Sequence, residues 1–163
     1  MKPKYKLLLI ITTLFFIIMP RAQAAQVGTV TITGAVPPTC DIVVTPTAGA
    51  SNIPDISIGA TDKQVATVNE NCNDPNGYTV TVAGTHSGNH TGLFVDSASS
   101  ASLPFTISYN GANAPVGGVV TNATVPGFNL NKTVAITYSA NNTLASTSGF
   151  TYAETLTFTI TAK

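Results

Sequence analysis

Two histidines lie four residues apart in the segment His86-Ser-Gly-Asn-His90. On a helix this spacing would place both imidazoles on one face, an arrangement that binds metal ions. The glycine and the polar residues between them instead predict a loop. We therefore interpret both histidines as solvent-exposed loop residues, and we expect no metal site and no cofactor.

The chain also lacks the residue patterns that support catalysis. It contains no Gly-x-Ser-x-Gly elbow, no phosphate-binding loop and no His-Glu-x-x-His motif. Its acidic residues occur singly, so no pair suggests glycoside hydrolysis. Tyr109, Tyr138 and Tyr152 lie in strand-like patterns and fit a core or a sheet face better than a sugar-stacking site. We predict that the protein is not an enzyme, and a secreted hydrolase is a remote alternative.

The first residues have the pattern of a secretory signal peptide, which we place at residues 1–24. Three lysines precede an apolar run from Leu7 to Met19, and Ala22-Gln23-Ala24 follows as a small-x-small cleavage site. The run is short for a bilayer span, so a retained membrane anchor is the weaker interpretation. Cleavage would leave 139 residues, the size of one domain, outside the cytoplasm.

Charge and cysteine content fit an exported protein. Residues 25–163 keep three lysines and all seven acidic residues, a net charge of −4 with histidine neutral, which argues against nucleic-acid binding. Cys40 and Cys72 are the only cysteines. An oxidising compartment favours a disulfide between them, worth roughly 3 to 4 kcal/mol. A pair of metal ligands is the alternative, but no further His or Cys lies near them.

Alternating polar and apolar residues predict an all-β fold. From Cys40 onward we expect about six substantial strands, and no run of ten residues has helical spacing. The expected strands begin near residues 40, 64, 78, 104, 132 and 152, with a short edge strand at Leu93–Val95. A sandwich of the immunoglobulin type needs about seven strands. The chain is one strand short, so we expect an unfilled apolar groove with unpaired backbone groups.

A further strand pattern lies near the start of the exported chain, at Gly28–Val36. Val30, Ile32, Gly34 and Val36 share one face. Pro37-Pro38 follows at once and stiffens the joint, which hinders folding back against Cys40 onward. This segment is therefore expected to join the sheet of another molecule. The alternative is that it forms the first strand of a complete, monomeric sandwich.

These features together resemble the subunits of chaperone–usher pili, of the type 1-like or the spore-coat-U (archaic) kind. The resemblance rests on the Gly28–Val36 alternation, Cys40, the run Val65-x-x-Val68-x-Glu70-x-Cys72, and a last alternating strand preceded by Gly149; the run Asn71–Tyr78 is closer to the spore-coat-U kind. It implies an incomplete immunoglobulin-like (pilin) sandwich plus an N-terminal donor strand. A chaperone strand completes such a fold in the periplasm, and the extension of the next subunit completes it in the fibre.

On this resemblance, residues 25–38 are the donor-strand extension and residues 39–163 are the pilin domain. The donor residues are Val30, Ile32, Gly34 and Val36, and the acceptor-groove strand within residues 152–162 presents Leu156, Phe158 and Ile160. We expect a structural, adhesion-supporting subunit of a bacterial surface pilus, exported through the periplasm. Its expected partners are a periplasmic chaperone, an outer-membrane usher and neighbouring subunits. The alternative is a self-complete secreted sandwich that binds a host glycan or protein.

Overall fold

The computed structural model describes residues 27–51, 56–86, 88, 90–142 and 152–163. The expected signal peptide, residues 1–24, lies outside them. The chain divides into two units, of which the first ends at Ala35 and the second is compact and spans Val36–Lys163. No helix among the described residues is long and apolar enough to cross a membrane.

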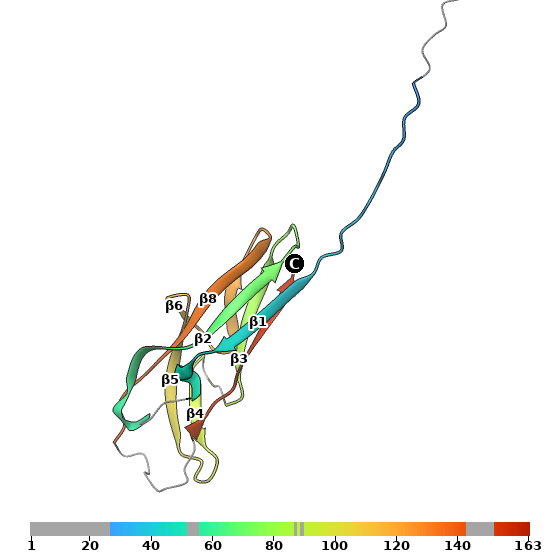
Figure 1. The fold of residues 1–163 in the computed structure, drawn as a ribbon. Helices are drawn as coiled ribbons and strands as arrows, with labels where there is room; N and C mark the ends of the chain where they lie inside the picture. The colour runs from blue at the N-terminus through green and yellow to red at the C-terminus, as the bar shows by residue number, and fades with distance from the viewer. Residues whose placement is uncertain (1–26, 52–55, 87, 89, 143–151) are drawn as a thin grey trace, which may run out of the picture. The chain divides into compact units, whose positions relative to one another are not determined.

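The described part of the compact unit consists of ten strands and two short helical turns. Figure 1 shows how these elements are arranged. The elements are β1 (Cys40–Pro46), α2 (Ala48–Ser51), η1 (Ile56–Ile58), β2 (Ala60–Cys72), β3 (Tyr78–Gly84), β4 (Gly92–Asp96), β5 (Ser102–Tyr109), β6 (Ala112–Ala114), β7 (Gly118–Asn122), β8 (Gly127–Tyr138), β9 (Tyr152–Ala153) and β10 (Leu156–Ala162). The all-β expectation is confirmed.

The strands form two antiparallel sheets. The larger sheet has seven strands in the order β1-β2-β8-β5-β4-β9, with β6 also paired to β5. The smaller sheet has three, in the order β10-β3-β7. The hairpin between β5 and β6 turns at Asn110-Gly111, where both residues have positive φ (52° and 81°). This is the geometry that an Asn-Gly pair favours.

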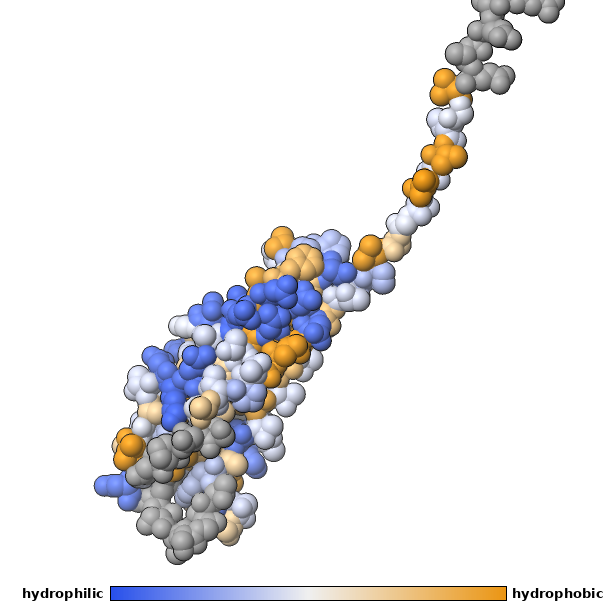
Figure 2. All heavy atoms as spheres, in the orientation of Figure 1, coloured by the Kyte–Doolittle hydropathy of each residue, from blue (hydrophilic) through white to orange (hydrophobic). Residues whose placement is uncertain are grey.

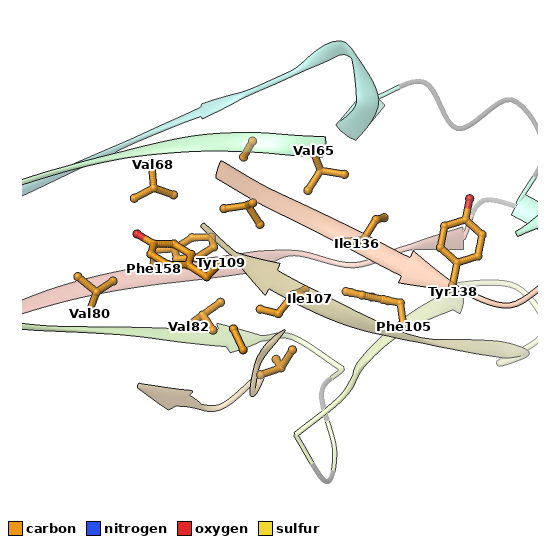
Figure 3. Close-up of a cluster of buried hydrophobic side chains, with 14 of the residues drawn as sticks. Val65, Val68, Val80, Val82, Phe105, Ile107, Tyr109, Ile136, Tyr138 and Phe158 are labelled. Carbon is orange, nitrogen blue, oxygen red and sulfur yellow. The ribbon is translucent and has the colours of Figure 1, made fainter. Parts of the chain in front are cut away.

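The core lies between the two sheets because each strand turns alternate side chains inward. In β5 the buried residues are Leu103, Phe105, Ile107 and Tyr109, and in β3 they are Tyr78, Val80 and Val82. Figure 3 shows side chains from both sheets gathered in the space between them. The rings of Tyr109 (β5) and Phe158 (β10) meet across this space with centroids 5.9 Å apart. The sheets therefore pack face to face.

The last predicted strand is wrong in one respect. The alternation from Tyr152 to Ala162 predicts a single strand, but the structure divides it into β9 and β10. β9 pairs with β4 in the larger sheet, whereas β10 pairs with β3 in the smaller one. Glu154 and Thr155 form the crossover between the sheets. Alternation continues through the crossover, so the pattern alone does not mark the change of sheet.

The sequence pattern also missed β6 and β7, and it misplaced β4. The Gly- and Pro-rich passage after Asn110 contains both missed strands, which are only three and five residues long. β4 was expected at a sheet edge, but it lies between β5 and β9. Gly92 of β4 pairs with Phe105, whose ring occupies the space that a side chain at position 92 would need. The buried position of the Phe105 ring therefore requires a glycine at position 92, which the sequence pattern assigned to a loop.

A buried carboxylate joins the two sheets. Glu70 in β2 is fully buried and accepts hydrogen bonds from three hydroxyl groups. These come from Tyr78 (2.9 Å), Tyr109 (2.6 Å) and Thr121 (2.6 Å). Tyr109 belongs to the same sheet as Glu70, while Tyr78 and Thr121 belong to the other. A buried carboxylate without donors would be strongly destabilising, so these hydroxyls are needed in their positions.

The network changes the acidity of its tyrosines. Burial, together with the hydrogen bond to Glu70, raises the pKa of Tyr78 to about 12, and the same causes raise the pKa of Tyr109 further. An unfolded tyrosine has a pKa of about 10. The folded state therefore favours the protonated phenols. The stability from this effect is complete below pH 10 or so and is lost as pH rises through about 12.

We predict that the free energy of unfolding falls by about 1 kcal/mol for each of these two tyrosines between pH 9 and pH 11. In Tyr78→Phe one of the two ionising groups is absent, so the fall should be about half as large. Urea denaturation of the oxidised chain at the two pH values measures this difference. An equal fall in both proteins would show that Tyr78 does not contribute.

Candidate functional site

Two strand edges lie side by side without pairing. Among the described strands, β1 pairs with β2 alone and β10 with β3 alone, so each ends its sheet. Cα atoms of the two strands nevertheless approach within 8 Å. Figure 1 shows the cyan β1 and the red C-terminal strand running along the same side of the compact unit. Each free edge presents backbone N–H and C=O groups that can pair with another strand.

An apolar groove lies between these edges. Its hollow measures about 260 Å³. The lining residues come from both sheets and are Val44, Pro46, Ala50, Val65, Ala66, Phe94, Phe105, Val134, Ile136, Glu154, Thr155, Leu156 and Phe158. Val65 and Ala66 are consecutive yet both buried, because the β2–β8 register shifts between Gln64 and Ala66. The sandwich is thus incompletely filled beside its unpaired edges.

The predicted acceptor residues lie on β10, in two different environments. Leu156 and Phe158 line the groove. Ile160 is half-buried and packs against the core, but it does not line the hollow. The predicted segment 152–162 also supplies only β10 to this edge, since β9 belongs to the other sheet. The groove therefore ends at the crossover.

The predicted donor residues lie in an extension without secondary structure. Residues 27–39 form no helix or strand. Val30, Ile32 and Val36 are 85%, 90% and 83% exposed, and nothing lies within 4 Å of the position a side chain on Gly34 would take. Figure 2 shows the apolar side chains recurring along this segment. Large apolar side chains so fully exposed are unusual, and they are typical of surfaces that bind a partner.

Asn73 fixes the chain where the extension meets β1. Its side-chain oxygen accepts a hydrogen bond from the Thr39 backbone N–H (2.6 Å), and its side-chain nitrogen donates to the Pro37 carbonyl (3.2 Å). Its own backbone N–H donates to the Thr39 carbonyl (3.1 Å). Asn73 follows Cys72 in a segment that predicts only a turn. The sequence position of Asn73, next to the predicted disulfide, was the one signal that it could hold the start of β1.

The predicted disulfide is confirmed. Cys40 and Cys72 are bonded and lie directly opposite each other in the β1–β2 ladder. The bond therefore holds the first residue of β1, the strand with the free edge, to the neighbouring strand β2. The disulfide lies next to the hydrogen bonds that Asn73 makes with Thr39 and Pro37.

A polar contact at the other end of the groove was not predicted. The Glu154 carboxylate contacts His86 Nδ1 (2.8 Å), and both of its oxygens accept from the His86 backbone N–H (3.1 Å each). His86 had been interpreted as a solvated loop residue; its side chain is 45% exposed but bound to Glu154, whose side chain is only 1% exposed. The sequence gives no signal for this contact, because 68 residues separate the partners.

His90 does not join this contact, and its hydrogen bond is made by the backbone carbonyl, which accepts from Val116. Among the described residues no group of three or more His, Cys, Asp or Glu side chains is placed to hold a metal ion. The chain was also compared with known proteins: no protein-family model matches it, and no curated protein matches it by sequence.

We predict that removing the disulfide destabilises the chain without changing its fold. The bond spans a sequence separation of 32 residues, so the double substitution Cys40→Ser with Cys72→Ser should lower the free energy of unfolding by roughly 3 to 4 kcal/mol. Urea denaturation of both proteins, with circular dichroism to check the β content, measures the effect. An unchanged midpoint would show that the β1–β2 ladder and Asn73 suffice to hold β1.

Proposed function

We propose that this chain is a structural subunit of a bacterial surface pilus, polymerised by insertion of one subunit's extension into the groove of the next. One observation carries the proposal: β1 and β10 flank an apolar hollow with unpaired edges. The same chain has a strand-patterned apolar segment, Val30–Val36, that lies in no strand. Addition of a strand to a free sheet edge is an established mode of protein recognition.

The lengths of the two segments match. β10 has seven residues, and Val30–Val36 also spans seven. Both alternate with the two-residue period of a strand, so one face of the inserted segment would meet the hollow and the other would meet solvent. The four inward residues would be Val30, Ile32, Gly34 and Val36. A glycine among them allows close approach of the backbones where the groove is shallow.

Insertion would be favoured by apolar burial and backbone hydrogen bonds, and opposed by the loss of conformational freedom. Burying Val30, Ile32 and Val36 would contribute on the order of 1.5 to 3 kcal/mol each. Each backbone hydrogen bond would add about 0.5 to 1.5 kcal/mol net. Ordering the inserted segment costs roughly 1 to 2 kcal/mol per residue. Because the groove already has its walls in place, the acceptor itself needs little further ordering.

The connection to β1 favours insertion into a neighbour. For residues 30–36 to lie along the β1 edge of their own chain, the backbone would have to reverse within Pro37-Pro38-Thr39. Proline restricts both its own φ and the residue before it to extended conformations, which disfavours such a tight reversal. Insertion into the next copy is head-to-tail, and repeated head-to-tail contacts that do not close into a ring generate a fibre.

The proposal includes the wider setting of such a subunit. The two-sheet arrangement fits an immunoglobulin-like pilin sandwich that lacks one strand, with residues 39–163 as the domain. Residues 1–24 would direct export, and a periplasmic chaperone would shield the groove before an outer-membrane usher passes the subunit to the cell surface. The disulfide fits this route, because disulfides form and persist in oxidising compartments such as the periplasm.

We predict that Ile32→Asp abolishes polymerisation, because a carboxylate would have to be buried in an apolar groove without a partner. Thr31→Asp is the matched control, since the neighbouring residue would face solvent in the inserted strand. Polymer yield is measured on gels in detergent, with and without boiling. Equal yields from Ile32→Asp and the unsubstituted chain would contradict the proposed insertion.

A further inference from the structure

The crossover Glu154–Thr155 forms the wall at one end of the groove. It follows β9 in the larger sheet and leads into β10 in the smaller sheet, so neither ladder includes it. Its hydrogen bonds come instead from the segment after β3. The Thr85 backbone N–H donates to the Thr155 carbonyl (3.1 Å), and His86 binds the Glu154 carboxylate through its backbone N–H and its ring.

The Glu154 side chain is in an unusual position for a carboxylate. It is 1% exposed and lies in a groove wall whose other lining residues are almost all apolar. The His86 ring, whose side chain is 45% exposed, contacts this carboxylate through Nδ1 at 2.8 Å. A buried carboxylate needs hydrogen-bond donors, so the position of the crossover depends on His86. Leu156 directly follows the crossover and also lines the groove, so its position depends on the position of the crossover.

We propose that the His86–Glu154 contact is a latch that holds the end of the acceptor groove in the shape that receives the inserted strand. Both are positioning residues, since they act through Leu156 and the crossover. The inference rests on the proposed strand insertion. It says that two residues outside β1 and β10 help to set how slowly the inserted strand dissociates.

The physical basis is preorganisation. With the latch formed, the crossover is fixed while the groove is empty, and the inserted strand meets a finished wall. Without the His86 ring the Glu154 carboxylate keeps only the backbone donor, and the crossover samples other positions. Insertion must then order the crossover again. The apparent affinity falls in proportion to the fraction of chains whose crossover is already in the binding position.

The test uses polymers of the full chain, with His86→Ala as the principal variant because this half-exposed side chain is dispensable for the core. The rate at which polymers dissociate in detergent at fixed temperature should rise about tenfold, as a loss of about 1.4 kcal/mol would produce. His86→Asn restores a side-chain donor close to the place of Nδ1 and should return the rate to near its original value. His90→Ala, on the same connection, should leave the rate unchanged.

The outcomes separate the latch from the proposed function. If the unsubstituted chain forms no boiling-sensitive polymers, strand insertion itself is wrong. If it does, and His86→Ala polymers dissociate at the same rate, the latch is wrong. Equal acceleration in His86→Ala and His86→Asn would also overturn the latch, because a specific donor would then not matter. Glu154→Met provides a second variant, which keeps the length of the side chain but offers no oxygen acceptor to His86 and should accelerate dissociation as His86→Ala does.

Discussion

The unfilled space between β1 and β10 is the constraint on which the rest of the structure depends. A sandwich normally pairs its strands and fills its interior, yet here two adjacent edges stay unpaired beside a hollow of about 260 Å³. Such a fold must be held open by other interactions, since interiors otherwise pack densely. The disulfide and the Asn73 hydrogen bonds hold the start of β1 to the end of β2, and the Glu70 network joins the two sheets.

These stabilising contacts are distributed unevenly along the groove. At one end the Cys40–Cys72 bond and Asn73 hold the start of β1, while Glu70 connects the two sheets nearby through hydroxyl groups. At the other end lie the hollow, the crossover and the His86–Glu154 contact. One end is therefore closed by a covalent bond and a fully buried carboxylate network, and the other by hydrogen bonds from Thr85 and from the half-exposed His86. We propose that this asymmetry leaves the groove stable when empty and open to an inserted strand.

The sequence predicted the strands whose alternation is long, and it predicted the disulfide from compartment and cysteine number. It missed β6 and β7 because three to five residues carry too little periodicity. The division of the last strand at Glu154 was missed because alternation is the same on both sides of the crossover. Leu156 and Phe158 line the hollow on the predicted strand, whereas the contacts of Glu70 and Glu154 depend on pairings between distant residues. Local pattern identifies faces of strands, but it does not identify partners across a sandwich.

The most direct test of the central claim compares the chain cleaved after residue 24 with a version that begins at Thr39, by size-exclusion chromatography and by gel electrophoresis with and without boiling. Strand insertion predicts a ladder of polymers that survives detergent, collapses on boiling and is absent from the shortened chain. A stable monomer of the longer chain, destabilised when the extension is removed, would contradict the account. Residues 27–36 would then complete their own fold, and a binding module for a glycan or protein would be the better interpretation.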